Sequence, residues 1–203
     1  MGTDIHLAAE VYRDGQWHLA SVDLPDGRNY RAFAILADVR NGYGFAGFDT
    51  GDPVVPIAYP RGFPEDLSKE LSKLLYIEDE EEEWLDDAQR DPPSVDEDEM
   101  EEIDHVWLGN ESFSWVTLKE LLDYDLDAPV TLRGKVPPDA AQRWKENREP
   151  PNNVAAYTSN PDWVTLEWQR PLQDSAPLIT ELINALKPLG EPSKVRIVFG
   201  FDS

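Results

Sequence analysis

The chain has 203 residues, and its 41 acidic and 18 basic side chains give a formal net charge of −23. A chain this acidic repels DNA, RNA and anionic membranes, which argues against direct binding of nucleic acid. It contains no cysteine, which excludes disulfides, thiolate catalysis and cysteine-based zinc sites. No apolar run approaches the roughly 18 residues of a membrane span, and the first residues lack the pattern of a signal peptide. We therefore expect a cytoplasmic protein without membrane contact.

The acidic residues are concentrated in one segment, residues 78–104. This segment holds sixteen acidic residues and one basic residue, Arg90, so it carries about fifteen of the 23 net negative charges. Its charge density and its Pro92-Pro93 break argue against a packed core element. The sequence therefore predicts a single domain over residues 1–203 with an acidic insert at 78–104 that is partly disordered or peripheral.

The N-terminal part predicts a hairpin followed by a helix. Apolar and polar residues alternate from residue 4 to residue 12, Asp14-Gly15 supplies a turn, and residues 16–20 form the returning strand. The apolar spacing of residues 29–39 predicts a helix, which Asn41-Gly42 ends.

The middle of the chain mixes loops, helices and a strand. A glycine-rich loop at residues 42–51 can cradle a phosphate with backbone amides, although a flexible loop is the simpler interpretation. An amphipathic helix is expected to begin near Glu65, and Thr117 with Glu120 fits a capping box for another. Residues 130–135 form a short predicted strand, and residues 138–147 a helix with Pro near its first turn.

The C-terminal part completes the predicted fold. Residues 163–168 alternate as a strand, and Asp174 or Ser175 can cap a helix that runs to Leu186 before Gly190. Residues 195–201 form the last strand. Because strands and helices mix without βαβ alternation, we expect an α+β domain with a mainly antiparallel sheet, several packed helices and adjacent terminal strands.

The first predicted strand carries the densest set of reactive side chains. Asp4, His6 and Glu10 lie at positions i, i+2 and i+6, so all three project from one face. A carboxylate beside an imidazole suits a divalent metal, or a general base that the carboxylate orients. Asp4 and His6 are therefore the candidate metal ligands, and a divalent metal is the one cofactor that this pattern suggests.

The last predicted strand has a similar polar side. Arg196 and Asp202 lie opposite its apolar row. If the terminal strands pair, these two residues join Asp4, His6 and Glu10 on one polar sheet face. The alternative is an ordinary solvent-exposed face with no ligand.

Three arginines in predicted loops are candidates for holding an anionic ligand. Arg28 and Arg40 flank the first predicted helix, and Arg61 lies in a Pro-Arg-Gly turn. Guanidinium groups that converge bind carboxylate or phosphate through paired hydrogen bonds. Asn29 and Tyr30 adjoin Arg28, and Asn29 also suits the helix cap. The alternative role of the arginines is ion pairing with the abundant carboxylates.

Ser114 is the remaining candidate binding residue. A serine nucleophile needs a neighbouring base, and the chain offers only His6, His18 and His105. No spacing rule connects any of these histidines with Ser114, which argues against a serine hydrolase. Whether the protein is an enzyme stays open on the sequence.

Six ordered segments resemble a family of uncharacterised proteins from tailed bacteriophages and some bacterial genomes, whose members open with Met-Gly-Cys/Thr-Asp-Ile-His and end with Val-Arg-Ile-Val-Phe-x-Phe-Asp. The matching segments are residues 1–6 with Glu10, residues 27–30 with Phe33, and residues 36–40, 60–68, 114–121 and 195–202. Relatives often carry His-Ser-His-Ser-Trp where this chain has Glu111-Ser112-Phe113-Ser114-Trp115. The resemblance implies a phage origin, and hence action in the cytoplasm of an infected bacterium, but no particular chemistry.

Three functions follow from these patterns. The first is a phage accessory protein of host-interaction or anti-defence type, which binds a small anionic or nucleotide-like ligand in a polar pocket. The second is an acidic mimic of nucleic acid that inhibits a DNA-binding host protein through residues 78–104. The third is a metal-dependent hydrolase that uses Asp4, His6 and Asp202. The expected partner is thus a small molecule or a host protein.

Overall fold

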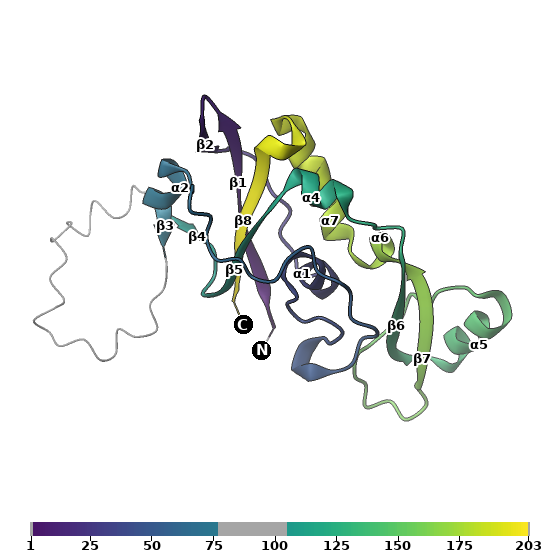
Figure 1. Cartoon of the computed structure of the whole chain (residues 1–203). Helices are drawn as coiled ribbons and strands as arrows, with labels where there is room; N and C mark the ends of the chain where they lie inside the picture. Colours follow the sequence, from purple (N-terminus) through teal and green to yellow (C-terminus); the bar gives the residue numbers. More distant parts are fainter. Residues whose placement is uncertain (1, 77–104, 203) are drawn as a thin grey trace, which may run out of the picture.

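The computed structural model describes residues 2–76 and 105–202 of the chain (Figure 1). It confirms an α+β fold in which the N-terminal and C-terminal strands are adjacent. The predicted acidic insert at residues 78–104 lies outside the described residues. In the part of the chain that is described, no helix is long and apolar enough to cross a membrane.

A four-stranded antiparallel sheet forms the centre of the molecule. Its strands, in spatial order, are β2 (Gln16–Leu19), β1 (Asp4–Arg13), β8 (Val195–Asp202) and β5 (Glu111–Thr117). The register places Asp4 opposite Asp202 and Glu10 opposite Arg196, which confirms the expected pairing of the terminal strands. Strand β5 was not predicted, and its pairing with β8 is irregular between Glu111 and Ser114.

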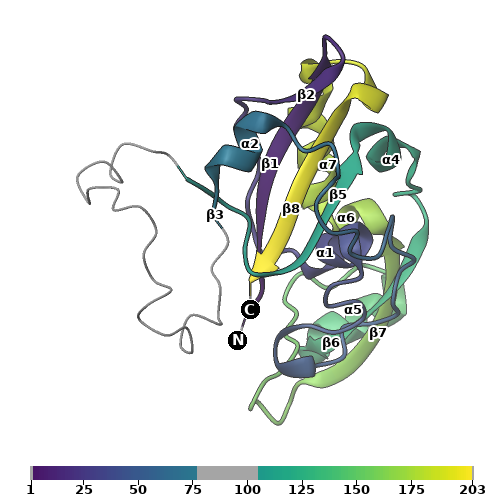
Figure 2. The ribbon, with the colours of Figure 1, turned by 60° about the vertical axis from the view of Figure 1, so that its left-hand side comes forward.

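One face of the sheet is covered by helices α1 (Tyr30–Ala37), α4 (Leu118–Asp123) and α7 (Pro177–Leu186). Figure 2 shows α7 behind the sheet. The rings of Phe33, Phe199 and Phe201 meet edge to face in this layer, with centroids 5.2 and 5.8 Å apart. Burying these apolar side chains drives the helices onto the sheet.

Two helix boundaries differ from the sequence prediction. Helix α1 ends at Ala37, because Asp38 adopts a left-handed conformation (φ 63°) that terminates the helix before Asn41-Gly42. The predicted helix that ends at Leu186 is α7, but its cap is Ala176, and the expected cap residues Asp174 and Ser175 lie in a separate short helix, α6 (Leu172–Ser175). Pro177 at the start of α7 has no amide hydrogen, so it suits a first helical turn but not a continuous helix.

The opposite face of the sheet is covered by helix α2 (Lys69–Leu74) and a short parallel pair, β3 (Leu75–Tyr76) and β4 (Val106–Trp107). Helix α2 begins after Ser68, whose hydroxyl accepts the Leu71 amide at 3.1 Å, and not near Glu65 as expected. Strands β3 and β4 therefore bring the two ends of the undescribed segment side by side.

A second, two-stranded sheet lies to one side of the central sheet (Figure 1). It pairs β6 (Pro129–Val136) with β7 (Val164–Pro171), and α5 (Pro138–Asn147) follows β6, as predicted. The glycine-rich loop packs against β6, where a side chain at Gly51 would collide with the Thr131 carbonyl. Short 3-10 helices complete the fold at Phe45–Gly47, Lys187–Leu189 and Pro192–Lys194.

Candidate functional site

The structure places the five polar residues of the terminal strands on one face of the central sheet. These residues are Asp4, His6, Glu10, Arg196 and Asp202, and the antiparallel register brings them together in pairs. The face is not one continuous site, however. Two separate clusters occupy its ends, and apolar residues lie between them.

The cluster at the Glu10 end is a buried ion network. Glu10 is 0% exposed and Arg196 is 2% exposed, and the Arg196 Nε donates to Glu10 Oε2 at 2.7 Å. Arg196 also donates through Nη1 to Asp66 Oδ1 at 2.6 Å, and its guanidinium lies 3.9 Å from the centre of the Trp17 ring. The Ser68 amide donates to the second Glu10 oxygen at 2.8 Å. Because the Glu10 carboxylate is buried and both of its oxygens accept hydrogen bonds within the chain, Glu10 serves the fold and is not placed to bind a ligand.

Asp4 lies at the other end of the face and is held by Arg28. Arg28 donates through Nε to Asp4 Oδ1 at 2.9 Å and through Nη2 to Oδ2 at 2.5 Å. This paired hydrogen bond lowers the pKa of Asp4 below its ordinary value, and it raises the pKa of Arg28. The Asp4 amide also donates to Asp202 Oδ1 at 3.2 Å. The predicted metal ligand is thus already occupied by a cation.

His6 is the second predicted metal ligand. Its ring packs on Trp107 with centroids 4.3 Å apart, and its Nε2 lies 3.5 Å from Asp202 Oδ1 without the geometry of a hydrogen bond. Among the described residues, no group of three or more His, Asp or Glu side chains could hold a metal ion. Asp4, His6 and Asp202 therefore lie together at one end of the paired strands, where Arg28 forms an ion pair with Asp4.

Arg61 and Ser114 form a separate contact and do not meet the other predicted arginines. Arg61 donates to Glu120 Oε1 at 2.6 Å and to the Trp115 carbonyl at 3.0 Å, and its guanidinium lies 4.8 Å from the centre of the Trp115 ring. Ser114 is fully buried, and its hydroxyl accepts the Arg61 amide at 3.2 Å. This arrangement joins the loop before α2 to β5, so we assign both residues to structure.

Arg40 and Tyr30, by contrast, line a common cavity of about 170 Å³. The lining residues are Tyr30, Arg31, Arg40, Thr50, Leu132 and Ser175. The set supplies two guanidinium groups and three hydroxyl groups. No carboxylate belongs to it, which is unusual in so acidic a chain.

The start of α1 positions this cavity. Asn29 caps the helix, since its Oδ1 accepts the Ala32 amide at 2.7 Å, as the sequence predicted. The Asn29 side chain also donates to the Ser175 carbonyl at 3.2 Å, which holds the end of α6 against the start of α1. Tyr30 accepts the Thr3 amide at 3.3 Å, and Arg40 donates through Nε to the Thr3 hydroxyl at 2.9 Å. Thr3 thus holds the side chains of Tyr30 and Arg40, which both line the cavity.

Arg31 gives the cavity its electrostatic character. It is 9% exposed, and its Nη1 donates to the Asp52 carbonyl at 2.7 Å. Among the described residues, no carboxylate oxygen lies within 4.0 Å of its guanidinium, and burial lowers the pKa of Arg31. A guanidinium stays protonated at neutral pH even so. Charge interactions with Tyr124 and Asp52 favour the protonated form, but the net effect is still a lowered pKa, so the chain compensates this buried charge only in part. A bound anion would compensate it further.

The predicted and observed lining residues overlap only in part. Tyr30 and Arg40 were predicted, whereas Arg31, Thr50 and Ser175 were missed. Arg31 left a signal in the sequence, because it interrupts the otherwise apolar helix Tyr30–Ala37. Thr50 and Ser175 left none, since their contribution depends on segments far apart in the chain.

Comparisons with known proteins give no further assignment. No protein-family model matches the chain, and neither a curated protein nor a solved structure matches it. The candidate site therefore rests on its own geometry.

Proposed function

We propose that the protein binds a small anion, a phosphate or carboxylate group of a small molecule, in the cavity beneath Arg31 and Arg40. The observation that carries this proposal is the buried Arg31 guanidinium, which has a carbonyl partner and no carboxylate within 4.0 Å among the described residues. An anion in the cavity offsets the desolvation cost of that charge. The affinity of the cavity for an anion therefore comes from the Arg31 charge, which folding has already removed from water.

The other lining groups suit the same ligand. Arg40 adds a second guanidinium, and Tyr30 and Thr50 add hydroxyl groups that can donate hydrogen bonds to anion oxygens. The Ser175 hydroxyl already donates to the Leu172 carbonyl at 3.0 Å. The volume of about 170 Å³ is below the roughly 300 Å³ at which sites for whole drug-sized ligands begin. The cavity accordingly holds one anionic group, and the remainder of a nucleotide-like ligand extends outside it.

The sequence resemblance supplies the biological setting of the proposal. A phage accessory protein of host-interaction or anti-defence type would use this cavity to sequester a small anionic molecule in the cytoplasm of the infected host. Sequestration requires no reaction, so the proposal assigns no catalytic residue.

Thermal unfolding in the presence of phosphate, pyrophosphate and adenine nucleotides tests the proposal. A ligand that binds only the folded state stabilises it by about 2.7 kcal/mol at one hundred times its Kd. We expect at least one of these anions to raise Tm at constant ionic strength. Arg40→Gln should reduce the shift.

Arg143→Gln is the matched control, because it removes the same charge from an exposed helix pair with Asp139. The control should keep the full shift. Equal shifts in the parent and both variants would mean non-specific ion effects. No shift with any of the anions would contradict the proposal.

A further inference from the structure

Strand β1 has one edge that is only partly paired. Strand β8 pairs with β1 from Asp4 to Val11, whereas β2 pairs with the other edge only over Glu10–Arg13. The last contact on that second edge is a hydrogen bond from the Ala20 amide to the Ala9 carbonyl at 2.9 Å. Among the described residues, no strand pairs with this edge before Ala9.

The direction of the backbone groups follows from alternation along the strand. The Asp4 amide points toward β8, where it meets Asp202, and the Ala9 carbonyl points away from β8 toward Ala20. Successive residues of a strand point their amide and carbonyl groups to opposite edges. The N–H and C=O of Leu7 therefore point to the open edge, and the described residues supply no hydrogen bond to either group.

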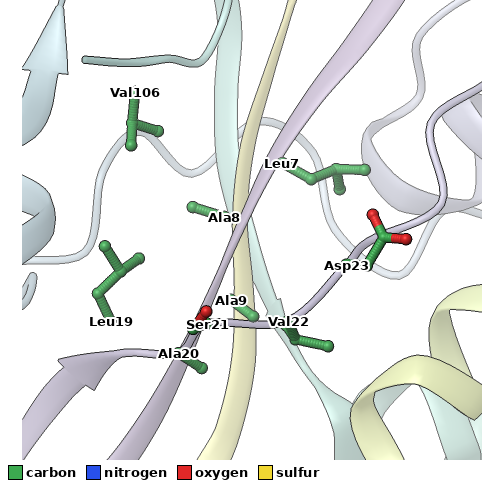
Figure 3. Close-up of a pocket in the computed structure, with 9 residues that line it drawn as sticks. All are labelled: Leu7, Ala8, Ala9, Leu19, Ala20, Ser21, Val22, Asp23 and Val106. Carbon is green, nitrogen blue, oxygen red and sulfur yellow. The ribbon is translucent and has the colours of Figure 1, made fainter. Parts of the chain in front are cut away.

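A groove of about 540 Å³ lies beside this edge (Figure 3). Its lining consists of Leu7, Ala8, Ala9, Leu19, Ala20, Ser21, Val22, Asp23 and Val106. Four of these nine side chains are alanine or serine, so another backbone can approach the edge closely. Figure 3 shows Ala8 directed toward Leu19 and Val106, with Asp23 on the other side of the strand.

We propose that this groove is a docking site for an extended, basic peptide segment of a partner protein, which adds to β1 as a strand. The open amide and carbonyl of Leu7 supply the main-chain hydrogen bonds of strand addition. The groove supplies the space that the added backbone needs. This site is distinct from the anion cavity, and the proposal does not depend on the proposed function.

The negative charge of the protein favours a basic peptide as the occupant of the groove. Among the described residues that line the groove, Asp23 is the one charged side chain, and it is exposed. The whole chain carries −23, so edge-to-edge pairing of two copies would bring two strongly negative molecules together. A basic partner is attracted by the negative charge of the chain, which speeds its association and stabilises the complex.

The side chains that line the groove also predict which residue types alternate along the peptide. Neighbouring residues of an added strand face opposite sides. Residues facing Ala8, Leu19 and Val106 should be small and apolar, and those facing Asp23 should be Lys or Arg. An alternating Lys-Val hexapeptide with blocked ends is therefore the probe of choice.

Amide hydrogen exchange, followed by NMR, tests the geometry directly. Saturating peptide should slow exchange of the Leu7 amide, whereas the Ala8 amide, which already faces β8, should change little. Of two peptides with N-methyl groups on alternate residues, the one that lacks the amide hydrogens facing β1 should bind weakly or not at all, and the one with the opposite placement should keep binding. Unchanged exchange at Leu7 on binding would overturn the proposal.

Two variants and one control complete the test. Ser21→Trp fills the groove from an exposed position and should abolish binding, while Asp23→Lys should weaken it on the order of tenfold. Asp26→Lys makes the same charge change at an exposed residue outside the lining and should have a smaller effect. Equal loss in both Lys variants, or slow Leu7 exchange caused by dimerisation without peptide, would contradict a basic peptide as the occupant.

Discussion

Arg196 and Arg31 are both almost completely buried, yet the fold treats their charges differently. Arg196 meets two carboxylates, Glu10 and Asp66, and its guanidinium packs on Trp17. Arg31 meets the carbonyl of Asp52 and lines a cavity. The carboxylates of the chain pair directly with the first cation, whereas none forms an ion pair with the second among the described residues.

This difference shows how an acidic chain can still present a site for an anion. Carboxylates are abundant, but several of the described ones form local pairs, such as Asp4 with Arg28 and Glu120 with Arg61. The residues that line the cavity include no carboxylate, and their polar side chains carry guanidinium and hydroxyl groups. Substitutions at Glu10 and at Arg31 should therefore have different effects on stability and on anion binding.

The largest effect should come from breaking the internal network. Glu10→Gln removes the buried carboxylate that matches Arg196, which leaves a buried guanidinium without its main partner. We expect the free energy of unfolding in urea to fall by about 3–5 kcal/mol. Asp66→Asn is the matched comparison, and it should cost less because that side chain is 66% exposed. Equal costs would show that burial does not decide the strength of the pair.

A smaller effect is expected at Glu120. Burial raises its pKa, but the hydrogen bonds from Arg61 and Thr117 outweigh burial, so the pKa lies below its ordinary value of 4.5. The stability it contributes is therefore complete above pH 4.5 and is lost as pH falls through the lowered pKa. Glu120→Gln should lower stability at pH 7 by about 1–2 kcal/mol, through the damaged cap and ion pair.

Urea titrations between pH 3 and pH 7 check this pH dependence. The difference in stability between parent and Glu120→Gln should shrink as the solution is acidified. A difference that is constant with pH would show that the carboxylate charge is not involved.

Arg31→Met should change stability less than Glu10→Gln does. Methionine fills similar space without a buried charge, and replacing a buried charge by an apolar side chain is often nearly neutral. We expect a change within about 1.5 kcal/mol in urea unfolding, with loss of any Tm shift caused by phosphate. A loss as large as that of Glu10→Gln would make Arg31 a structural residue.

The smallest effect is expected from the bulk acidity. Replacing residues 78–104 by a Gly-Ser linker of equal length removes about fifteen of the 23 net negative charges. Because the described ion pairs are local, stability should change by only a few tenths of a kcal/mol. The same variant tests nucleic-acid mimicry: if the parent inhibits a DNA-binding protein and the variant does so equally, mimicry by this segment is wrong.

The sequence predicted the parts of the fold that depend on local rules. The capping box of Thr117 and Glu120 is confirmed with both reciprocal hydrogen bonds, and helix α5 has the predicted bounds. The pairing of β1 with β8 was expected without a local rule that required it, and it is confirmed. Strand β5 was not predicted. Ser112 has a positive φ of 53°, and the pairing of β5 with β8 is irregular there, so the side chains of β5 do not alternate regularly between the two faces of the sheet.

The candidate site was less predictable for a physical reason. Residue type identified Arg40 and Tyr30, but the convergence of Arg28, Arg40 and Arg61 required knowing the register and the loop paths. Arg61 instead contacts β5, and Glu10 lies in the core. The decisive residue, Arg31, is next to a predicted one, and only its burial distinguishes it from an ion-paired surface arginine.

The most direct measurement is an NMR titration of the arginine Nε–H resonances with phosphate at constant ionic strength. If the cavity binds an anion, the resonances of Arg31 and Arg40 move together and saturate at one dissociation constant, while that of the neutralised Arg196 stays in place. Movement of all three without saturation, or no movement of Arg31, would contradict the central claim.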